Sequence, residues 1–87
     1  MDSLLLDSLL DNDRKIIRWP KKKDEKLAVL QYLKTKLNPG IEYTEKEINA
    51  VIISWHIFMD FTLLRREMIV NGLLERTPDC RKYWIPK

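Results

Sequence analysis

The sequence has few of the residues that build disulfides, metal sites and flexible loops. Its 87 residues include one cysteine, Cys80, and one histidine, His56. A disulfide within the chain is therefore excluded, and so is a structural zinc site, which needs four nitrogen or sulfur ligands. Two glycines and four prolines are too few for a disordered chain, and no glycine-rich phosphate loop is present. We expect one folded domain over residues 1–87, with no cofactor.

Long apolar runs are missing as well. No run approaches the roughly 20 residues of a membrane-spanning helix, and the acidic N-terminus is unlike that of a signal peptide. We expect no membrane partner, and the single thiol is typical of a reducing, cytoplasmic setting. His56 has no acid and nucleophile in a catalytic pattern around it, so it is expected to be a packing or capping residue. The sequence thus favours a non-enzymatic protein.

Charge is distributed unevenly along the chain. Residues 1–13 contain four aspartates and no lysine or arginine, whereas the rest holds all 16 basic residues and the other nine acidic ones, a net charge of +7. A basic body favours polyanionic partners through nonspecific electrostatics. Ordinary surface charge, which keeps a protein soluble, explains the same composition. Composition leaves both explanations open.

Apolar spacing predicts a short helix and a long one in the first half of the chain. Leucines in residues 3–10 fall on one side of a helix, which is too short to be stable alone and must pack on the body or on another subunit. We describe residues 1–11 as an appendage of the domain. Leucines recur at helical spacing over residues 24–37, with Asp24 as the expected cap. Residues 38–40, Asn-Pro-Gly, end this long helix.

Two further helices are predicted in succession. Thr44 followed by Glu47 is the pattern of a capping box, so a helix is expected from residue 45 to residue 55 or 56. Asp60 is expected to cap the next helix, over residues 61–71. The link between them has about four or five residues, which suits a helix-turn-helix corner.

Three short strands complete the prediction. Residues 73–77 and 82–85 form a hairpin around a turn that contains proline. Residues 16–19 are expected to join this hairpin in a small antiparallel sheet, since one strand cannot stand alone. Trp19 and Trp84 would then pair across strands. Helix, strand, three helices and hairpin predict an α+β, helix-rich, winged helix-turn-helix domain with an extra N-terminal helix.

The third long helix places its two arginines in different environments. With its first residue at zero and about 100° per residue, the buried arc runs from about 300° to about 80°. Arg65 falls inside this arc and is expected to be structural, since an unpaired buried guanidinium is costly. Glu42, Glu47 and Asp60 are its candidate partners. Arg66 falls outside the arc and faces outward.

The outward side of this helix is the candidate reading surface. Arg66 lies beside Thr62 and Val70, where it would meet a phosphate or a guanine edge. The alternative is a solvated arginine that pairs with Glu67 or Glu75. Leu63 and Val70 are the apolar residues on this outward side. They would contact thymine methyl groups or a partner protein, or be covered by the N-terminal helix. A homodimer through the N-terminal helix or through this third helix is a further possibility.

Other basic residues lie where they could flank the reading surface. They are Lys21, Lys22, Lys23, Arg76, Arg81 and Lys82. We assign the three lysines before the long helix, and Arg81 and Lys82 at the hairpin tip, to the phosphate backbone of DNA. The alternative is that the lysine run is a solvated helix start and the hairpin tip an ordinary basic surface.

Several motifs of this chain occur together in a known family. They are Trp19-Pro20-Lys21, Leu27-Ala28-Val29-Leu30, Tyr43-Thr44-Glu45-Lys46-Glu47-Ile48-Asn49, Leu63-Leu64-Arg65-Arg66-Glu67, Gly72-Leu73-Leu74-Glu75-Arg76-Thr77-Pro78-Asp79 and Tyr83-Trp84. Through them, residues 10–85 resemble a bacterial domain family of unknown function. It occurs as small stand-alone proteins and at the C-terminus of some transcriptional regulators. The resemblance implies a winged-helix-like fold and a nucleic-acid role.

The chain departs from this family at two turns. Members usually have glycine in the turn where this chain has Arg14, and glycine at the hairpin position that Cys80 occupies. Glycine adopts positive φ without steric cost, so its replacement predicts altered turn geometry at both positions.

The leading hypothesis is a cytoplasmic winged-helix protein that binds double-stranded DNA in transcriptional regulation. The alternative is a protein-interaction or dimerisation module on the same scaffold, which binds no nucleic acid. Winged helices serve both purposes, so the predicted fold does not decide between them.

Overall fold

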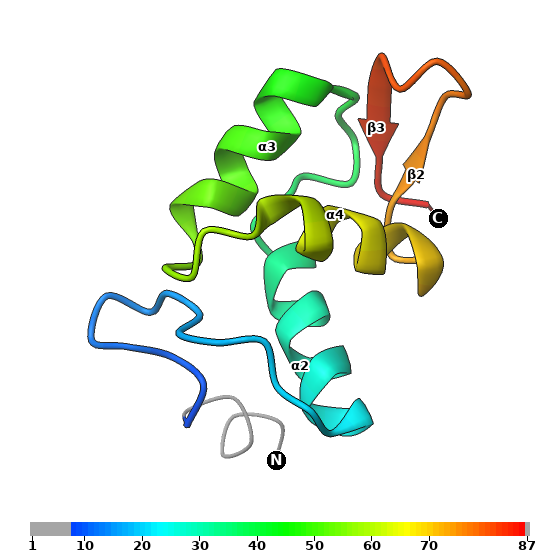
Figure 1. Ribbon diagram of the computed structural model, residues 1–87. Helices are drawn as coiled ribbons and strands as arrows, with labels where there is room; N and C mark the ends of the chain where they lie inside the picture. The colour runs from blue at the N-terminus through cyan, green and yellow to red at the C-terminus, as the bar shows by residue number, and fades with distance from the viewer. Residues whose placement is uncertain (1–7, 87) are drawn as a thin grey trace.

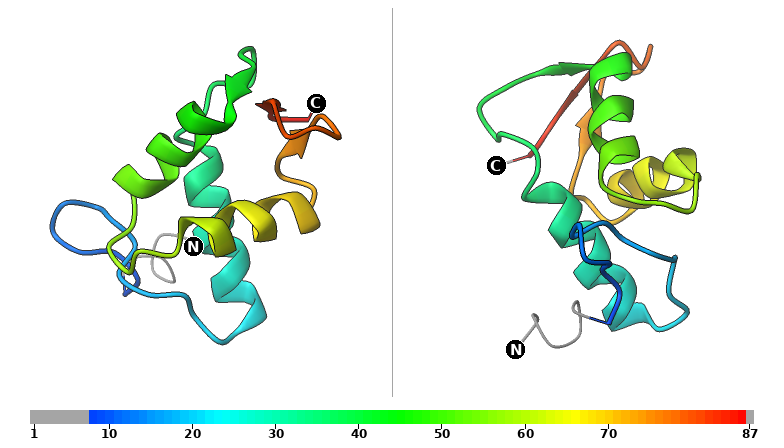
Figure 2. Two further views of the ribbon diagram at one scale, coloured as in Figure 1. Left: turned by 45° about the horizontal axis from the view of Figure 1, so that its top comes forward. Right: turned by 90° about the vertical axis from the view of Figure 1, so that its left-hand side faces the viewer.

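The computed structural model describes residues 8–86 as three helices and a small antiparallel sheet, an α+β arrangement (Figure 1). The elements are α2 (Lys23–Lys34), β1 (Tyr43–Thr44), α3 (Glu45–Ser54), α4 (Phe61–Val70), β2 (Glu75–Arg76) and β3 (Lys82–Trp84). Strand β3 is central, between β1 and β2. The N-terminal end of α2 and the β2–β3 turn lie at opposite ends of the molecule (Figures 1 and 2). No helix in the described part is long and apolar enough to cross a membrane.

Helix α2 follows the predicted leucine pattern but differs at both ends. Val29, Leu30 and Leu33 are buried against the rest of the core. Asp24 is not the cap: it lies in the first turn, after the N-cap residue Lys22, whose side chain makes no capping hydrogen bond. The helix ends at Lys34, three residues before the predicted end at residue 37. The early end follows because the next residues form turns, with successive amides bonded to carbonyls three residues back.

The caps of α3 and α4 are confirmed. Thr44 Oγ1 accepts from the Glu47 amide at 3.1 Å, and the Glu47 carboxylate accepts from the Thr44 amide at 2.9 Å. Asp60 Oδ1 accepts from the Leu63 amide at 3.2 Å. After α4, Gly72 takes a φ of 75°, the left-handed conformation that commonly ends a helix. Both helices stop slightly earlier than predicted, at Ser54 and Val70 respectively.

The link between α3 and α4 is organised by His56. This side chain is 6% exposed, and its two ring nitrogens bond to the backbone on either side. Nε2 accepts from the Asp60 amide at 3.0 Å, so Nδ1 carries the proton and donates to the Ile52 carbonyl at 2.6 Å. The expected packing and capping role of His56 is confirmed, because the ring joins the end of α3 to the N-cap of α4.

The predicted third strand of the sheet is wrong. Ile16 forms only isolated bridges, to Leu10 and His56, and the structure assigns no strand over residues 16–19. The third place belongs to β1, which pairs antiparallel with β3. The reason is tertiary: Ile16 is 0% exposed, and its amide donates to the Trp55 carbonyl at 2.8 Å, at the end of α3. That anchor holds the segment away from the hairpin (Figure 1).

The predicted cross-strand pair of Trp19 and Trp84 is therefore wrong as well. Trp19 lies beside α2, where the Lys26 ammonium is 5.7 Å from its ring centroid. Trp84 lies on β3, in register with Glu75. The predicted pair required residues 16–19 to be a strand of the sheet, whereas burial of Ile16 in the core holds this segment at the end of α3.

Most of the predicted N-terminal helix lies outside the described residues. Within them, residues 8 and 9 form a turn and Leu10 a bridge, so this end of the predicted helix is not helical. Leu9 is 0% exposed and belongs to the core of its own domain.

The two turns that lack glycine keep the left-handed geometry, so the altered geometry expected there is not found. Arg14 has a φ of 64° and Cys80 a φ of 62°. Cys80 closes the hairpin turn, in which its amide donates to the Thr77 carbonyl at 3.0 Å. A non-glycine residue in this conformation costs roughly 1–2 kcal/mol. The predicted turn is thus correct, and the chain tolerates its strain.

Candidate nucleic-acid interface

The β2–β3 hairpin presents one side to the helices, because side chains alternate along its strands. Tyr83 is 1% exposed on this side, and its ring centroid lies 5.8 Å from the Arg65 Cζ atom. Arg76 stands opposite Tyr83 in the β2–β3 register, so it shares this side. We call it the helix side of the hairpin.

A groove of about 390 Å³ lies between the outward face of α4 and the helix side of the hairpin. We call it the α4–hairpin groove. Its lining residues are Thr62, Arg65, Arg66, Ile69, Val70, Arg76, Cys80 and Tyr83. Three of them are arginines and none is acidic. The groove thus brings positive charge from a helix and from a strand to one concave surface.

Arg65 is a largely buried, structural residue at the inner side of the groove, as its place in the buried arc of the helix predicts. Its side chain is 18% exposed. Its Nη1 atom donates to the Asn49 side-chain oxygen at 2.5 Å and lies 3.3 Å from the Glu45 carboxylate. Arg65 therefore joins α4 to α3, while its guanidinium lies close to Tyr83 of β3.

The three partners proposed for Arg65 are wrong because each is engaged elsewhere. Glu47 completes the capping box of α3, and Asp60 caps α4. Glu42 pairs with Lys82 Nζ at 3.4 Å. The actual partners are Glu45 and Asn49. They are four residues apart, one helical turn from each other on the same face of α3.

Arg66 is exposed, as predicted. It makes no ion pair with any residue that the structure describes, so the alternative pairing with Glu67 or Glu75 is not found. Thr62 is exposed on the same face, and Val70 is 72% exposed. The structure therefore gathers Thr62, Arg66 and Val70 into one groove. These are three of the eight residues predicted for the site.

The other five predicted residues lie elsewhere. Lys21, Lys22 and Lys23 are exposed at the start of α2, at the end of the molecule away from the hairpin turn (Figure 2). Arg81 is 84% exposed at the tip, where its Nε atom lies 3.5 Å from the Asp79 carboxylate. Lys82 points away from the helices. The prediction that they flank one surface with α4 does not hold for the lysine run or for Lys82.

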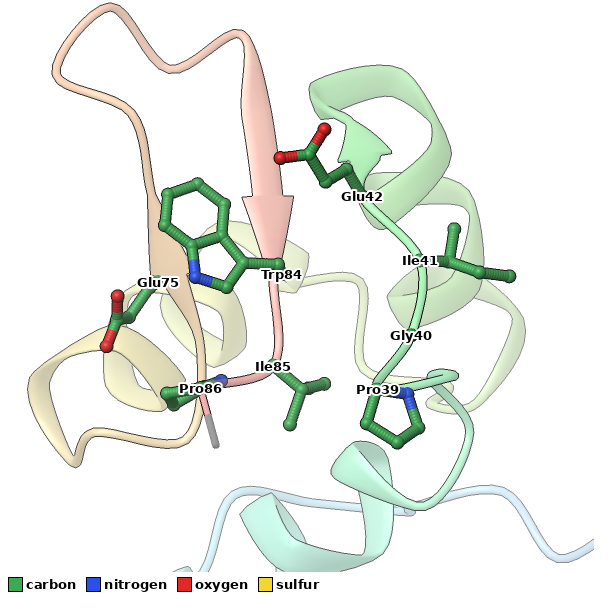
Figure 3. Close-up of a pocket in the computed structure, with 8 residues that line it drawn as sticks. All are labelled: Pro39, Gly40, Ile41, Glu42, Glu75, Trp84, Ile85 and Pro86. Atoms are coloured by element: carbon green, nitrogen blue, oxygen red, sulfur yellow. The ribbon is translucent and has the colours of Figure 1, made fainter.

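Lys82 and Trp84 lie on the outer side of the hairpin, which is acidic. Figure 3 shows the Trp84 indole between the side chains of Glu42 and Glu75. These three residues line a second cavity of about 390 Å³ with Ile85 as a neighbour. The paired Lys82 neutralises only one of the two carboxylates. The two sides of one hairpin thus differ in charge.

Arg76 is the groove residue that the sequence named only as a flanking cation. It is exposed and pairs with no carboxylate among residues 8–86, although its Nη1 atom donates to the Thr77 carbonyl at 3.1 Å. Its position follows from the register: Thr77 and Lys82 close the turn, so Arg76 is opposite Tyr83. The sequence signal for this position is the alternation of side chains along the two predicted strands, which places Arg76 on the side of Tyr83 once Tyr83 is recognised as a buried residue.

Tyr83 adds no negative charge to the groove. Burial raises the pKa of the Tyr83 hydroxyl, although the nearby Arg65 guanidinium acts in the opposite direction. Tyr83 therefore stays neutral at physiological pH. At the tip, the pKa of Asp79 is lowered, first by the hydrogen bond from the Thr77 hydroxyl and then by the Arg81 amide. Asp79 thus belongs to the turn and does not line the groove.

A known bacterial family matches most of the chain. The family model for "Uncharacterized protein conserved in bacteria (DUF2087)" matches residues 15–85. The chain belongs to DUF2087. The resemblance to a bacterial family of unknown function is thereby confirmed, whereas a link of DUF2087 to transcriptional regulators stays a prediction. No curated protein and no solved structure matches the chain.

Proposed function

We propose that this DUF2087 protein is a non-enzymatic winged helix-turn-helix protein that binds double-stranded DNA through the α4–hairpin groove, in the cytoplasm and in transcriptional regulation. The element order supports the winged-helix assignment: α3 and α4 are the helix-turn-helix pair, and the β2–β3 hairpin is the wing. Strand β1 pairs with β3, which ties the start of α3 to the wing.

One observation carries the proposal: Arg66 and Arg76 reach the same groove from different elements, and neither pairs with a carboxylate in the described structure. Guanidinium groups without a carboxylate partner are suited to phosphates and guanine edges, which they contact with two parallel hydrogen bonds. The ten residues of α4 span about 15 Å, and the major groove of DNA admits a helix. In the proposed complex, Arg66 faces the major groove of the DNA from α4, and Arg76 faces a flanking phosphate from the wing.

Salt dependence of DNA binding tests the proposal. Fluorescence anisotropy with a generic labelled duplex is measured across a salt series from about 50 to 200 mM. Each phosphate contact adds about −0.9 to the slope of log affinity against log salt. We expect clear binding at low salt, and a slope that becomes shallower by about 0.9 in Arg76→Ala.

The control uses a basic residue of the same hairpin that faces the other way. Lys82→Ala removes one positive charge on the outer side, so it is expected to leave the slope nearly unchanged. Lys22→Ala serves the same purpose at the far end of the molecule. A wild-type protein that binds no duplex at the lowest salt would refute the proposal.

A second candidate function is a protein-interaction module. Three large apolar side chains are exposed around the α3–α4 corner: Ile53 is 51% exposed, Ile57 is 52% exposed and Met59 is 91% exposed. Contact with a second copy would remove this apolar surface from water. Analytical ultracentrifugation of the wild type and of Met59→Ser tests this candidate. A concentration-dependent dimer that Met59→Ser weakens would support it, and a monomer at all concentrations would exclude self-association.

A further inference from the structure

The outward face of α4 carries an apolar side chain among polar ones. Val70 is 72% exposed and lines the same groove as Arg66. A single exposed valine is ordinary on a protein surface, so its exposure alone indicates nothing. Its position is informative, because Thr62, Arg66 and Val70 are spaced four residues apart along one line of the helix. At 1.5 Å per residue, neighbouring members are about 6 Å apart along the helix axis.

These three side chains differ in what they can distinguish in the major groove. An arginine with a free guanidinium contacts O6 and N7 of guanine with two hydrogen bonds. The 5-methyl group of thymine is apolar and accepts contact from an aliphatic side chain. A threonine hydroxyl bonds to several bases, so Thr62 discriminates little. Base discrimination is therefore expected to come from Arg66 and Val70.

The other two arginines of the groove are poorly placed to read bases. Arg65 is held by Asn49 and Glu45, and only 18% of its side chain is exposed. Arg76 belongs to the hairpin and not to the outward line of α4. Arg66 alone combines an outward position on α4 with a guanidinium free of carboxylates in the described structure.

We infer that α4 reads guanine through Arg66 and thymine through Val70, at adjacent or nearly adjacent base pairs of double-stranded DNA. This inference rests on the proposed DNA-binding function. The two positions are close together because Arg66 and Val70 are one helical turn apart, about 6 Å along the helix axis, and residues one turn apart on a helix in the major groove contact successive bases. Arg76 contributes affinity without sequence preference, because a phosphate contact carries no base information.

Selection from a random duplex library tests the inference. The wild type is expected to enrich a motif with guanine and thymine at adjacent or nearly adjacent base pairs. Val70→Ala is expected to lose the thymine preference and Arg66→Ala the guanine preference. Arg76→Ala serves as the matched control, since it should weaken binding to all sequences and leave the motif unchanged. Thermal melts of each variant confirm that it is folded.

Replacement of thymine by deoxyuridine in the selected duplex removes only the methyl group. We expect about fourfold weaker binding by the wild type, the effect of burying one methyl group, and no change for Val70→Ala. Equal thymine and deoxyuridine affinities, or a motif that Val70→Ala leaves intact, would overturn the inference while the DNA-binding proposal stands. Failure of the wild type to bind any duplex at low salt would overturn the DNA-binding proposal itself.

Discussion

The helix side and the outer side of the β2–β3 hairpin differ in chemistry although neighbouring residues build them. Arg76 and Tyr83 face the helices and line a groove without carboxylates. Glu75 and Trp84, each one residue away along the chain, face outward together with Glu42. The alternation of side chains along a strand separates them. Sequence neighbours on a strand therefore belong to different surfaces, and a basic stretch does not amount to a basic patch.

Helix α4 shows the same separation on a different period. Arg65 and Arg66 are adjacent, but about 100° of rotation separates them on the helix. Arg65 turns inward to Glu45 and Asn49, whereas Arg66 turns outward into the groove. Arg65 of α4 and Tyr83 of the hairpin thus form the wall of the groove. Arg66 of α4 and Arg76 of the hairpin face a ligand or solvent. Two predictions test this division, and two more concern the turn that sets the register of the hairpin.

The largest expected effect is on stability, and it separates the two arginines of α4. Arg65→Ala leaves the Asn49 oxygen and the Glu45 carboxylate without their partner, so the free energy of unfolding should fall by about 2 kcal/mol. In a domain of this size the melting temperature should drop by roughly 10 °C. Arg66→Ala should change stability by less than about 0.5 kcal/mol. Calorimetry measures both, and equal losses would contradict the assignment of Arg65 to the fold.

The second prediction compares the two sides of the hairpin in DNA binding. At about 50 mM salt, Arg76→Ala should weaken duplex binding about fivefold, as expected for the loss of one phosphate contact. Lys82→Ala, on the outer side, should weaken it less than about twofold. Both variants lose one positive charge, so net charge alone predicts equal effects. If the two variants behaved alike, the helix side would have no special role.

The third prediction concerns the turn that sets the hairpin register. Cys80→Gly should stabilise the protein by about 0.5–1 kcal/mol. Glycine adopts the φ of 62° at this position without steric strain, and the strain removed is larger than the cost of the greater entropy of glycine in the unfolded chain. Cys80→Ala keeps the strained backbone and is the control, with no stabilisation expected. Urea unfolding measures both. Destabilisation by the glycine variant would show that the thiol packing outweighs the strain.

The smallest effect is the acid sensitivity of the same turn. The folded-state pKa of Asp79 is lowered from its ordinary value of 3.8, chiefly by the Thr77 hydroxyl. A depressed carboxylate pKa means that its contribution to stability is present above pH 3.8 and is lost as pH falls through the folded-state value. The difference in melting temperature between the wild type and Asp79→Ala should therefore shrink between pH 5 and pH 3. A difference that is constant over this range would refute the role of the ionised carboxylate.

Local sequence signals predicted the elements well because each signal acts over a few residues. The Thr44–Glu47 capping box, the Asp60 cap and the turn at residues 77–80 all form as expected. Each depends on a side chain that bonds to the backbone three or four residues away, or on a proline that presets φ. The outward position of Arg66 was also predictable, because helical periodicity requires only the sequence of one helix.

Long-range partners were not predictable for the opposite reason. The strand beside β3 is β1 and not residues 16–19, and Arg65 pairs with Glu45 and Asn49. Several segments and several carboxylates suited each role equally well by local criteria. The choice depended on which core position Ile16 occupies and on which carboxylates were already engaged in caps or in the pair with Lys82.

The sequence by itself determined the three helices, the caps of α3 and α4, the hairpin turn and the inward and outward residues of α4. The physical reason is that helix periodicity, capping and turn geometry are properties of short stretches of chain. Only the tertiary structure decided which strand completes the sheet and which arginines share a groove. Those outcomes depend on packing: burial of Tyr83 against α4 turns Arg76 into the groove, and the same alternation directs Lys82 to the acidic outer side.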